Sequence, residues 1–374
     1  MSRCLLKNGT LWGCEGVTDI LVEDDRIVKI APHLECEDGQ TVDLTGRTVL
    51  PGFFNAHVHL YGVHGALPDE LIQKFVLGGV TTIRDMGVTA TITFEEYQQW
   101  LAQRTGPEFP SVIPAGKFLC GPNTYGAVHP SGALIGYVID ETPEGAAQAV
   151  DAMADGGACL IKTGLDYGMN PADPLDYLSE EVFRAICDRA RERGLPSAAH
   201  ITKTDNFLRA AQWGLTESAH VTHSPMTDEE VAQAAASGMA VTPTLSIFDM
   251  VSAETGEKIM DDAISNTGRL YRAGMPLAVG TDFMFENPPY QTAGIPVHEL
   301  RLLHKAGLSV DEIIRAATID SARICGVAEE TGSIEEGKRA DLIALSSPID
   351  ETFQAFEHIP FVMNRGTIIK NDPS

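Results

Sequence analysis

The chain of 374 residues contains no apolar run long enough to cross a bilayer, and its first residues lack the apolar core of a signal peptide. It contains no CxxC pair: the seven cysteines are an odd number and lie scattered, which argues against a disulfide framework or a zinc knot. Basic residues are few, 27 against 52 acidic ones, and the formal net charge of −25 argues against nucleic acid and anionic membranes as partners. These absences predict a cytoplasmic protein with reduced thiols.

Both ends of the chain are predicted to be rich in β-strands. The strand candidates are 19–23, 26–30, 41–44, 47–50, 339–345, 361–363 and 367–369. Neither end is large enough to be stable unaided. We therefore expect residues 1–50 and 332–374 to pair into one discontinuous β-sandwich domain, with residues 51–331 as an insert between them.

The insert alternates short apolar strands with amphipathic helices. After a first strand that ends near residue 59, the further strand candidates are 79–85, 112–119, 158–162, 196–200, 216–220, 240–244 and 277–282. Helices are expected near 68–78, 94–103, 143–155 and 179–193. A doubly wound sheet would show a similar alternation. Eight strands in a single run favour closure into a catalytic (β/α)8 TIM barrel over 51–331.

The first barrel strand carries two histidines, His57 and His59, separated by one residue. In a strand, residues i and i+2 point to the same face, so two imidazoles would lie side by side at the strand's end. Neutral imidazole is the commonest side-chain ligand for zinc and similar ions. On its own, the pair fits two histidines near a surface loop equally well.

Other predicted strand ends also carry polar side chains. Lys162 ends the fourth strand, His200 the fifth, His220 the sixth and Asp282 the eighth. Since the active site of such a barrel lies at the C-terminal ends of its strands, these groups should converge with the two histidines of the first strand. Any one of them alone could be a buried or capping residue. Together they predict a metal site.

Lys162 needs a separate explanation, because an ammonium group does not bind a metal ion. It follows the apolar run Cys159-Leu160-Ile161, so burial should lower its pKa and favour the neutral amine. A neutral amine can add carbon dioxide to give a carbamate, a carboxylate that can bridge two metal ions. The alternative is a salt bridge to Asp282 or Asp166.

The motif Pro51–His59, together with Lys162, His200, His220 and Gly280-Thr281-Asp282, resembles the amidohydrolase superfamily. The segments 316–323 and 332–342 look like that family's return from the barrel to the sandwich. The resemblance covers almost the whole chain. Within the superfamily, the sequence is most similar to the prolidase-like and imidazolonepropionase-like group.

The resemblance implies a binuclear centre, usually of zinc, although the same ligands accept manganese or cobalt. It assigns His57, His59 and Asp282 to the more buried ion and His200 and His220 to the other, with carboxylated Lys162 and a hydroxide bridging the two. Asp282 would take the proton of the hydroxide and deliver it to the leaving nitrogen, as a general base that becomes a general acid.

One departure from the family pattern bears on the reaction. Deaminases and related members of the family follow the histidine of the fifth strand with a nearby glutamate, but here the sequence after His200 is Ile201-Thr202-Lys203. This disfavours deamination and true imidazolonepropionase activity. It favours hydrolysis of a C–N bond in a small molecule such as an N-acyl amino acid, an Xaa-Pro dipeptide or a cyclic amide. The alternatives are a lactonase, esterase or phosphoesterase at the same centre and a non-catalytic scaffold, and a homo-oligomer is left open.

Substrate contacts are expected from the loops at the strand ends. His129, after the third strand, could hold a substrate carbonyl or oxyanion, and it could equally be an exposed loop histidine. Tyr167 could do the same, and His223 could replace His220 as a ligand. Arg84 and Lys203 could receive a substrate carboxylate, although a structural role is the simpler expectation for each.

The segment after Asp282 is unusually apolar: it contains Phe283, Met284, Phe285 and Tyr290. Such a segment could form a hydrophobic wall of the site. It could also be buried against a neighbouring subunit.

Overall fold

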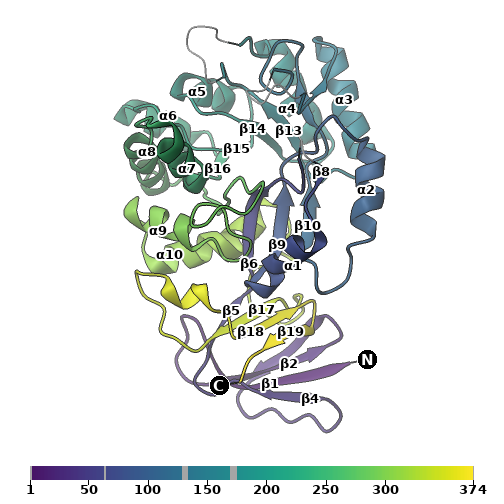
Figure 1. The fold of residues 1–374 in the computed structure, drawn as a ribbon, viewed down its shortest axis with the longest axis vertical. Helices are drawn as coiled ribbons and strands as arrows, with labels where there is room; N and C mark the ends of the chain where they lie inside the picture. The colour runs from purple at the N-terminus through teal and green to yellow at the C-terminus, as the bar shows by residue number, and fades with distance from the viewer. Residues whose placement is uncertain (1, 63–64, 129–133, 169–174, 374) are drawn as a thin grey trace.

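The computed structural model describes residues 2–62, 65–128, 134–168 and 175–373. Figure 1 shows two parts, a β-sheet region that holds both termini and, above it, a ring of helices around parallel strands. We propose 1–50 with 332–374, and 51–331, as the two domains. The described residues contain no helix long and apolar enough to cross a membrane.

The sheet region joins strands from both ends of the chain. Its strands are β1 (Arg3–Leu11), β2 (Thr18–Glu23), β3 (Arg26–Ala31), β4 (Gln40–Asp43), β5 (Thr48–Pro51), β17 (Leu342–Leu345), β18 (Phe361–Asn364) and β19 (Thr367–Asn371). The order is β19-β18-β17-β5-β1-β2-β3, and β4 pairs with β1. The ends meet where β5 runs antiparallel to β17, with Leu50 opposite Ile343. Both side chains are fully buried, so this junction is part of the core.

The barrel has the eight parallel strand positions expected from the sequence. They are β6 (Phe53–Val58), β9 (Val80–Asp85), β10 (Ser111–Pro114) continued by β11 (Phe118–Cys120), β13 (Ile161–Gly164), β14 (Ser197–His200), β15 (Glu217–Ser218), β16 (Ala240–Val241) and the segment 277–282. Parallel bridges from Val241 to Leu277 and from Val58 to Phe283 close the ring. The third strand is interrupted at Gly116, whose φ of 73° a strand cannot accommodate.

Helices cover the outside of the barrel (Figure 1). They are α1 (Asp69–Leu77), α2 (Phe94–Ala102), α3 (Pro143–Asp155), α4 (Glu180–Glu192), α5 (Thr204–Gln212), α6 (Asp228–Ala236), α7 (Leu245–Thr255), α8 (Met260–Arg272), α9 (Val297–Lys305), α10 (Val310–Arg315), the π-helical turn η1 (Ala316–Asp320) and α11 (Ser321–Ile324). The helix α2 begins with a capping box, in which Thr93 accepts from the N–H of Glu96 and the Glu96 side chain accepts from the N–H of Thr93. Short elements complete the fold: the hairpin β7 (Tyr61–Gly62) and β8 (Gly65–Ala66), the strand β12 (Tyr137–Val138) and the 3₁₀ turn η2 (Gln354–Glu357).

A buried ion pair crosses the barrel interior. Arg84, on β9, donates from its Nε to the carbonyl oxygen of Ala56 at 2.8 Å, and its guanidinium group pairs with Glu217 on β15. Thr242 donates its hydroxyl to the same carboxylate at 2.6 Å. Arg84 is fully buried and therefore ties strands together, rather than receiving a substrate carboxylate.

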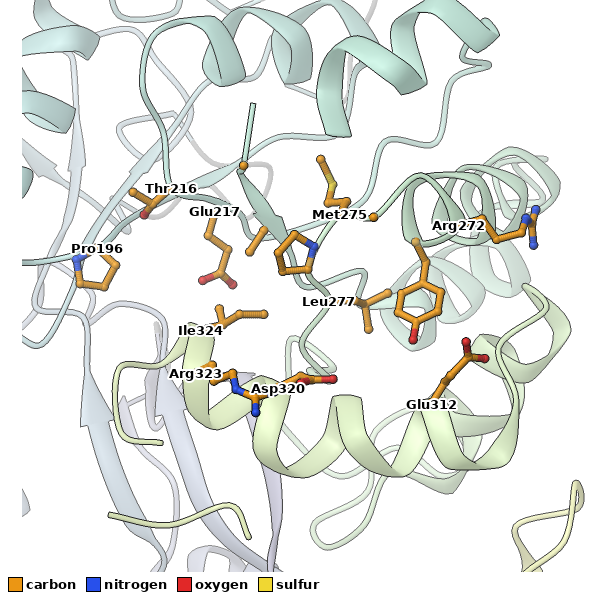
Figure 2. Close-up of a pocket in the computed structure, with 15 residues that line it drawn as sticks. Pro196, Thr216, Glu217, Arg272, Met275, Leu277, Glu312, Asp320, Arg323 and Ile324 are labelled. Carbon is orange, nitrogen blue, oxygen red and sulfur yellow. Dashed lines mark hydrogen bonds and ion pairs between the residues drawn. The ribbon is translucent and has the colours of Figure 1, made fainter. Parts of the chain in front are cut away.

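A hollow of about 820 Å³ lies at the opposite end of the barrel from the strand ends that carry the histidines. Its lining includes Pro196, Thr216 and Pro276, which stand at the beginnings of strands. Figure 2 shows this hollow between those strands and the helical turns that carry Asp320 and Arg323. Glu217 forms part of its wall, although only 2% of that residue is exposed.

Candidate active site

The two histidines at the end of β6 and the aspartate of the eighth strand meet at one point. The Nε2 atoms of His57 and His59 lie 3.1 Å and 3.0 Å from the same atom, Oδ1 of Asp282. These three residues each offer one ligand atom, all within 4.8 Å of one another. Val58, between the histidines, points away and is fully buried. The alternation of the strand therefore places two imidazoles against one carboxylate, as the HxH spacing predicts.

The other ring nitrogen of each histidine is held by an oxygen atom. Nδ1 of His57 lies 3.0 Å from the carbonyl oxygen of Ala219, and Nδ1 of His59 lies 3.2 Å from that of Gly87. Because a carbonyl can only accept, both Nδ1 atoms carry a hydrogen in the neutral rings, and both Nε2 lone pairs then face the carboxylate. A divalent cation among these three groups relieves their repulsion, so the donor set fits a metal ion.

Burial and the neighbouring charges together shift the pKa values of the residues in this cluster. Burial lowers the pKa of His57 to about 4, despite the opposing effect of Asp282. Burial by itself would raise the pKa of Asp282, but the charge and hydrogen bonds of the two histidines outweigh it and hold that pKa well below its ordinary value. Burial lowers the pKa of His59, but the hydrogen bond and charge of Asp282 outweigh it and raise that pKa. At neutral pH the site thus keeps an ionised Asp282 beside a neutral His57, and a metal ion that binds His59 must displace any proton from its ring.

Asp282 is held in an unusual backbone conformation. Its φ of 57° lies in the left-handed region, which costs free energy for a residue other than glycine. The preceding residue, Thr281, is clamped: its N–H donates to Asn55 at 3.2 Å, its hydroxyl accepts from Asn55 at 2.8 Å, and its carbonyl accepts from Gln291 at 2.9 Å. We infer that Asn55 and Gln291 fix the direction of the Asp282 side chain.

Lys162 lies in the same cavity with its amine buried. In the described part of the chain, its Nζ has no hydrogen-bond partner, so neither Asp282 nor Asp166 forms the salt bridge that was the alternative. Burial lowers the pKa of Lys162 to about 7, against the opposing charges of Asp282 and Glu217. A large share of the amine is then neutral at physiological pH. An amine that is buried, neutral and unpartnered fits the precursor of a carbamate.

His200 and His220 lie beside this cluster. The ring of His220 is 5.0 Å from that of His57 and 4.6 Å from that of His200, between centroids. Nδ1 of His220 lies 2.7 Å from the hydroxyl of Thr244, while His200 stacks on Tyr125 at 3.9 Å between centroids. All six residues predicted as metal ligands therefore line one cavity of about 170 Å³. Its other lining residues are Gly62, Met86, Gly87, Thr89, Phe118, Tyr125, Ile135 and Met284.

None of the three residues predicted to contact the substrate is among the described residues that line the cavity. The hydroxyl of Tyr167 donates to Asp205 at 2.6 Å and accepts from Arg209 at 2.7 Å, and Tyr167 is outside the cavity lining. His223 is also outside it and packs its ring against Phe248 at 5.3 Å. His129 lies outside the described residues. The roles of these three in substrate binding stay predictions.

Three residues next to the ligands were not predicted from the sequence. Tyr125 and Thr244 touch ligand rings across separate loops, and neither belongs to a motif. Thr244 has a φ of 52°, which a β-branched residue rarely adopts, so its contact with His220 was not foreseeable from local preference. The third, Asp85, ends the second strand as the ligands end theirs, and this position was the one available signal.

Asp85 joins the two loops that hold His59. Its carboxylate accepts from the N–H of Leu60 and from that of Gly87, both at 3.3 Å, and from the hydroxyl of Tyr97. Asp85→Asn replaces one accepting oxygen by a donor, so we expect the free energy of unfolding to fall by about 1–3 kcal/mol and metal affinity to fall with it. Chemical denaturation and metal titration measure the two effects. Tyr97→Phe is the control, since it removes one donor and leaves both accepting oxygens, and an equal loss of metal affinity there would contradict the role of Asp85.

The barrel, the β-sheet built from both chain ends and this cluster are the features of a class of hydrolases that carry candidate metal ligands at the strand ends. The sequence profile of the amidohydrolase family matches residues 48–370, and the chain belongs to that family. The resemblance inferred from the motifs is thereby confirmed. The chain is an enzyme, a hydrolase that acts on carbon–nitrogen bonds.

Among characterised relatives, the imidazolonepropionase of Geobacillus kaustophilus (strain HTA426) is 24% identical over 427 residues, covering 98% of this chain and 91% of that protein. The dihydroorotase of Thermoanaerobacter sp. (strain X514) is 24% identical over 410 residues, covering 93% and 89%. Among solved structures, a prolidase complexed with N-methylphosphonate-L-proline has a TM-score of 0.84 at 22% identity, covering 99% and 100%. A Xaa-Pro dipeptidase with bound methionine has a TM-score of 0.83 at 21% identity, with the same coverage. At such identities the two structures support the fold.

Proposed function

We propose that this enzyme hydrolyses an amide C–N bond of a small molecule at a binuclear metal centre. The observation that carries the proposal is the convergence of His57 and His59 on Asp282 beside the unpartnered amine of Lys162. An N-acyl amino acid, an Xaa-Pro dipeptide and a cyclic amide are the candidate substrates. The relatives named imidazolonepropionase and dihydroorotase and the prolidase structure support C–N bond cleavage as the reaction.

The residues divide into two groups of ligands and one proton carrier. His57, His59 and Asp282 would hold one divalent ion, His200 and His220 a second, and carboxylated Lys162 would bridge them. When bound, two zinc ions supply Lewis acidity toward the substrate carbonyl and acidify water. Asp282 takes a proton from the attacking water and passes it to the leaving nitrogen, for which its low pKa provides an ionised carboxylate at the start of the reaction.

The absence of an acid after His200 restricts the reaction further. Ile201 is fully buried, and Thr202 donates both its N–H, at 2.8 Å, and its hydroxyl, at 2.7 Å, to Asp166. Neither position offers a free proton donor for a substrate ring. This supports amide hydrolysis over deamination and over true imidazolonepropionase activity.

Metal content tests the binuclear centre. Protein purified without chelator should contain close to two divalent ions per chain by elemental analysis, because two separate ligand groups are present. Dialysis against a chelator should remove both the metal and the turnover, and zinc, manganese or cobalt should restore them. One ion per chain, or none, would contradict the proposal.

A substrate panel tests the reaction. It should contain N-acyl amino acids, Xaa-Pro dipeptides and cyclic amides, with lactones and phosphoesters as the competing class. Turnover of amides above the other classes is expected. Turnover of lactones without any amide would show that the amide assignment is wrong.

We also propose a cytoplasmic setting, a small-molecule substrate, and neither nucleic acid nor membrane as a partner. All seven cysteines are free thiols, as a reducing compartment would keep them. The formal net charge of −25 disfavours anionic partners. The oligomeric state stays open between a monomer and a homo-oligomer.

A further inference from the structure

Apart from the six predicted ligands, the catalytic cavity is lined mainly by apolar side chains. Its large side chains are those of Met86, Phe118, Tyr125, Ile135 and Met284. Phe118 and Tyr125 pack edge to face, at 6.1 Å between centroids, so this part of the wall is aromatic. A cavity of about 170 Å³ with such a wall accepts an apolar group next to the reacting bond.

The apolar surface continues out of the cavity. Six exposed side chains, which we call the apolar rim, are Val128, Leu134, Tyr137, Val138, Met284 and Phe285. Each is between 40% and 47% exposed. Met284 belongs to both the rim and the cavity lining, and Ile135 of the lining adjoins rim residues along the chain. The apolar lining of the cavity therefore reaches the rim at Met284 and, along the chain, beside Ile135.

Two separate segments build the apolar rim at the mouth of the barrel. Tyr137 and Val138 form β12, which runs parallel to β11 with Tyr137 opposite Leu119. Met284 and Phe285 follow Phe283, whose bridge to Val58 fixes that segment beside β6. An exposed apolar surface of this kind is costly in water unless a ligand or a partner covers it.

Cations that could recognise a substrate carboxylate do not line this cavity. Lys162 is the one lysine or arginine among the described lining residues, and it is assigned to the metal centre. Arg84 pairs with Glu217 inside the barrel, and Arg209 donates to Tyr167 at 2.7 Å and lies 3.5 Å from Asp205. The usual partner of a carboxylate is thus engaged elsewhere.

Further observations agree with the absence of substrate-binding cations from the cavity lining. Lys203 stands at the N-cap of α5, outside the cavity lining. The segments 63–64, 129–133 and 169–174, which lie outside the described residues, contain neither lysine nor arginine. The formal net charge of −25 further disfavours an anionic substituent on the substrate.

We infer that the substrate is an amide with a large, uncharged apolar substituent, which lies along the cavity wall and the apolar rim. This inference rests on the proposed function, because it names the substrate class of the same site. Among the candidate amides, it ranks neutral ones above those that carry a free carboxylate.

A series of acyl p-nitroanilides tests the inference. From acetyl to butyryl to hexanoyl, kcat/KM should rise by about fourfold per CH₂ until the apolar surface is covered. The matched pair is glutaryl and 5-methylhexanoyl p-nitroanilide: the two have similar shape, and the one that ends in a carboxylate should react at least about tenfold more slowly. An anilide that is not cleaved is tested as an inhibitor. Its inhibition constant is measured against the amide that the enzyme hydrolyses fastest in the substrate panel, and the constants of the series are compared in the same way.

Variants of the apolar rim show where the substituent binds. Leu134→Ser and Phe285→Ser should each reduce kcat/KM for the hexanoyl compound more than for the acetyl compound, by about threefold to tenfold. Val28→Ser and Leu77→Ser are the controls, because these side chains are 38% and 45% exposed on other faces, and they should leave the series unchanged. Sedimentation of each variant checks the alternative occupant, a second copy of the chain.

The possible outcomes separate the inference from the proposed function. A flat series, a preference for the glutaryl compound, or rim variants that change the sedimenting mass and not the series would overturn the inference while amide cleavage stands. If no amide at all is cleaved, the proposed function itself fails. A rising series that depends on Leu134 and Phe285 supports both.

Discussion

Lys162→Ala is expected to lower kcat/KM by about 10³-fold or more, the scale of losing a principal electrostatic stabiliser of the transition state. The amine of Lys162 is buried in the same cavity as the histidines and Asp282 and has no hydrogen-bond partner among the described residues. Its structural contribution is therefore small, and its pKa of about 7 keeps much of it neutral and able to add carbon dioxide. Metal analysis should show that the variant binds its ions more weakly.

The controls for this experiment fill the volume that the Lys162 side chain vacates, either with an added carboxylate or with another side chain. Short carboxylates such as formate, acetate and propionate should partly restore activity to Lys162→Ala, because they can occupy the vacated volume and replace the carbamate. Lys162→Met fills that volume with an apolar chain and should not be rescued. The free energy of unfolding of both variants should stay close to that of the parent or exceed it, since a buried amine without a partner costs free energy. Full activity of Lys162→Ala without added carboxylate would contradict a bridging carbamate.

The barrel could be predicted from the sequence because its strands are buried on both faces. Such strands read as short apolar runs, as in Ala278-Val279 before Asp282, and the predicted ligands stand at or just after the ends of these runs. The same boundary places ligands at the mouth, so strand prediction and site prediction depend on one pattern. The interruption of the third strand at Gly116 was not foreseen, since a single glycine in a strand does not reveal its φ.

The groups around the ligands could not be predicted, because they act across the chain. Thr244 reaches His220 across 24 residues, and Asn55 reaches Thr281 across 226. No local pattern joins such pairs, and their partners become evident once the barrel has closed. The partners of loop residues could not be predicted either. Tyr167 closely follows the strand that carries Lys162, yet its hydroxyl forms hydrogen bonds with Asp205 and Arg209.

The ion pair between Arg84 and Glu217 is the clearest example of a contact between residues far apart in the sequence. Its loss should have a large effect on the free energy of unfolding. Arg84 stands near the end of β9, and the structural role that was the simpler expectation agrees with its ion pair, although its partner Glu217, 133 residues later on β15, was not predicted. A buried ion pair contributes modestly as a pair, whereas either charge left alone in the interior is strongly unfavourable. Arg84 is fully buried, so Glu217 and not water neutralises its charge in the folded protein, although Glu217 itself borders the hollow of Figure 2.

Glu217→Ala should therefore lower the free energy of unfolding by about 3–5 kcal/mol, since it leaves the guanidinium of Arg84 unpaired among apolar strands. Urea denaturation measures the loss. The double variant Arg84→Met/Glu217→Leu removes both charges and should lose less than Glu217→Ala alone, because neither charge of the pair is left without its partner. Arg191→Ala breaks an exposed pair with Asp188, whose two side chains are 60% and 59% exposed, and should cost no more than about 1 kcal/mol. If Glu217→Ala cost as little as Arg191→Ala, the pair in the barrel interior would not hold the strands below the catalytic site.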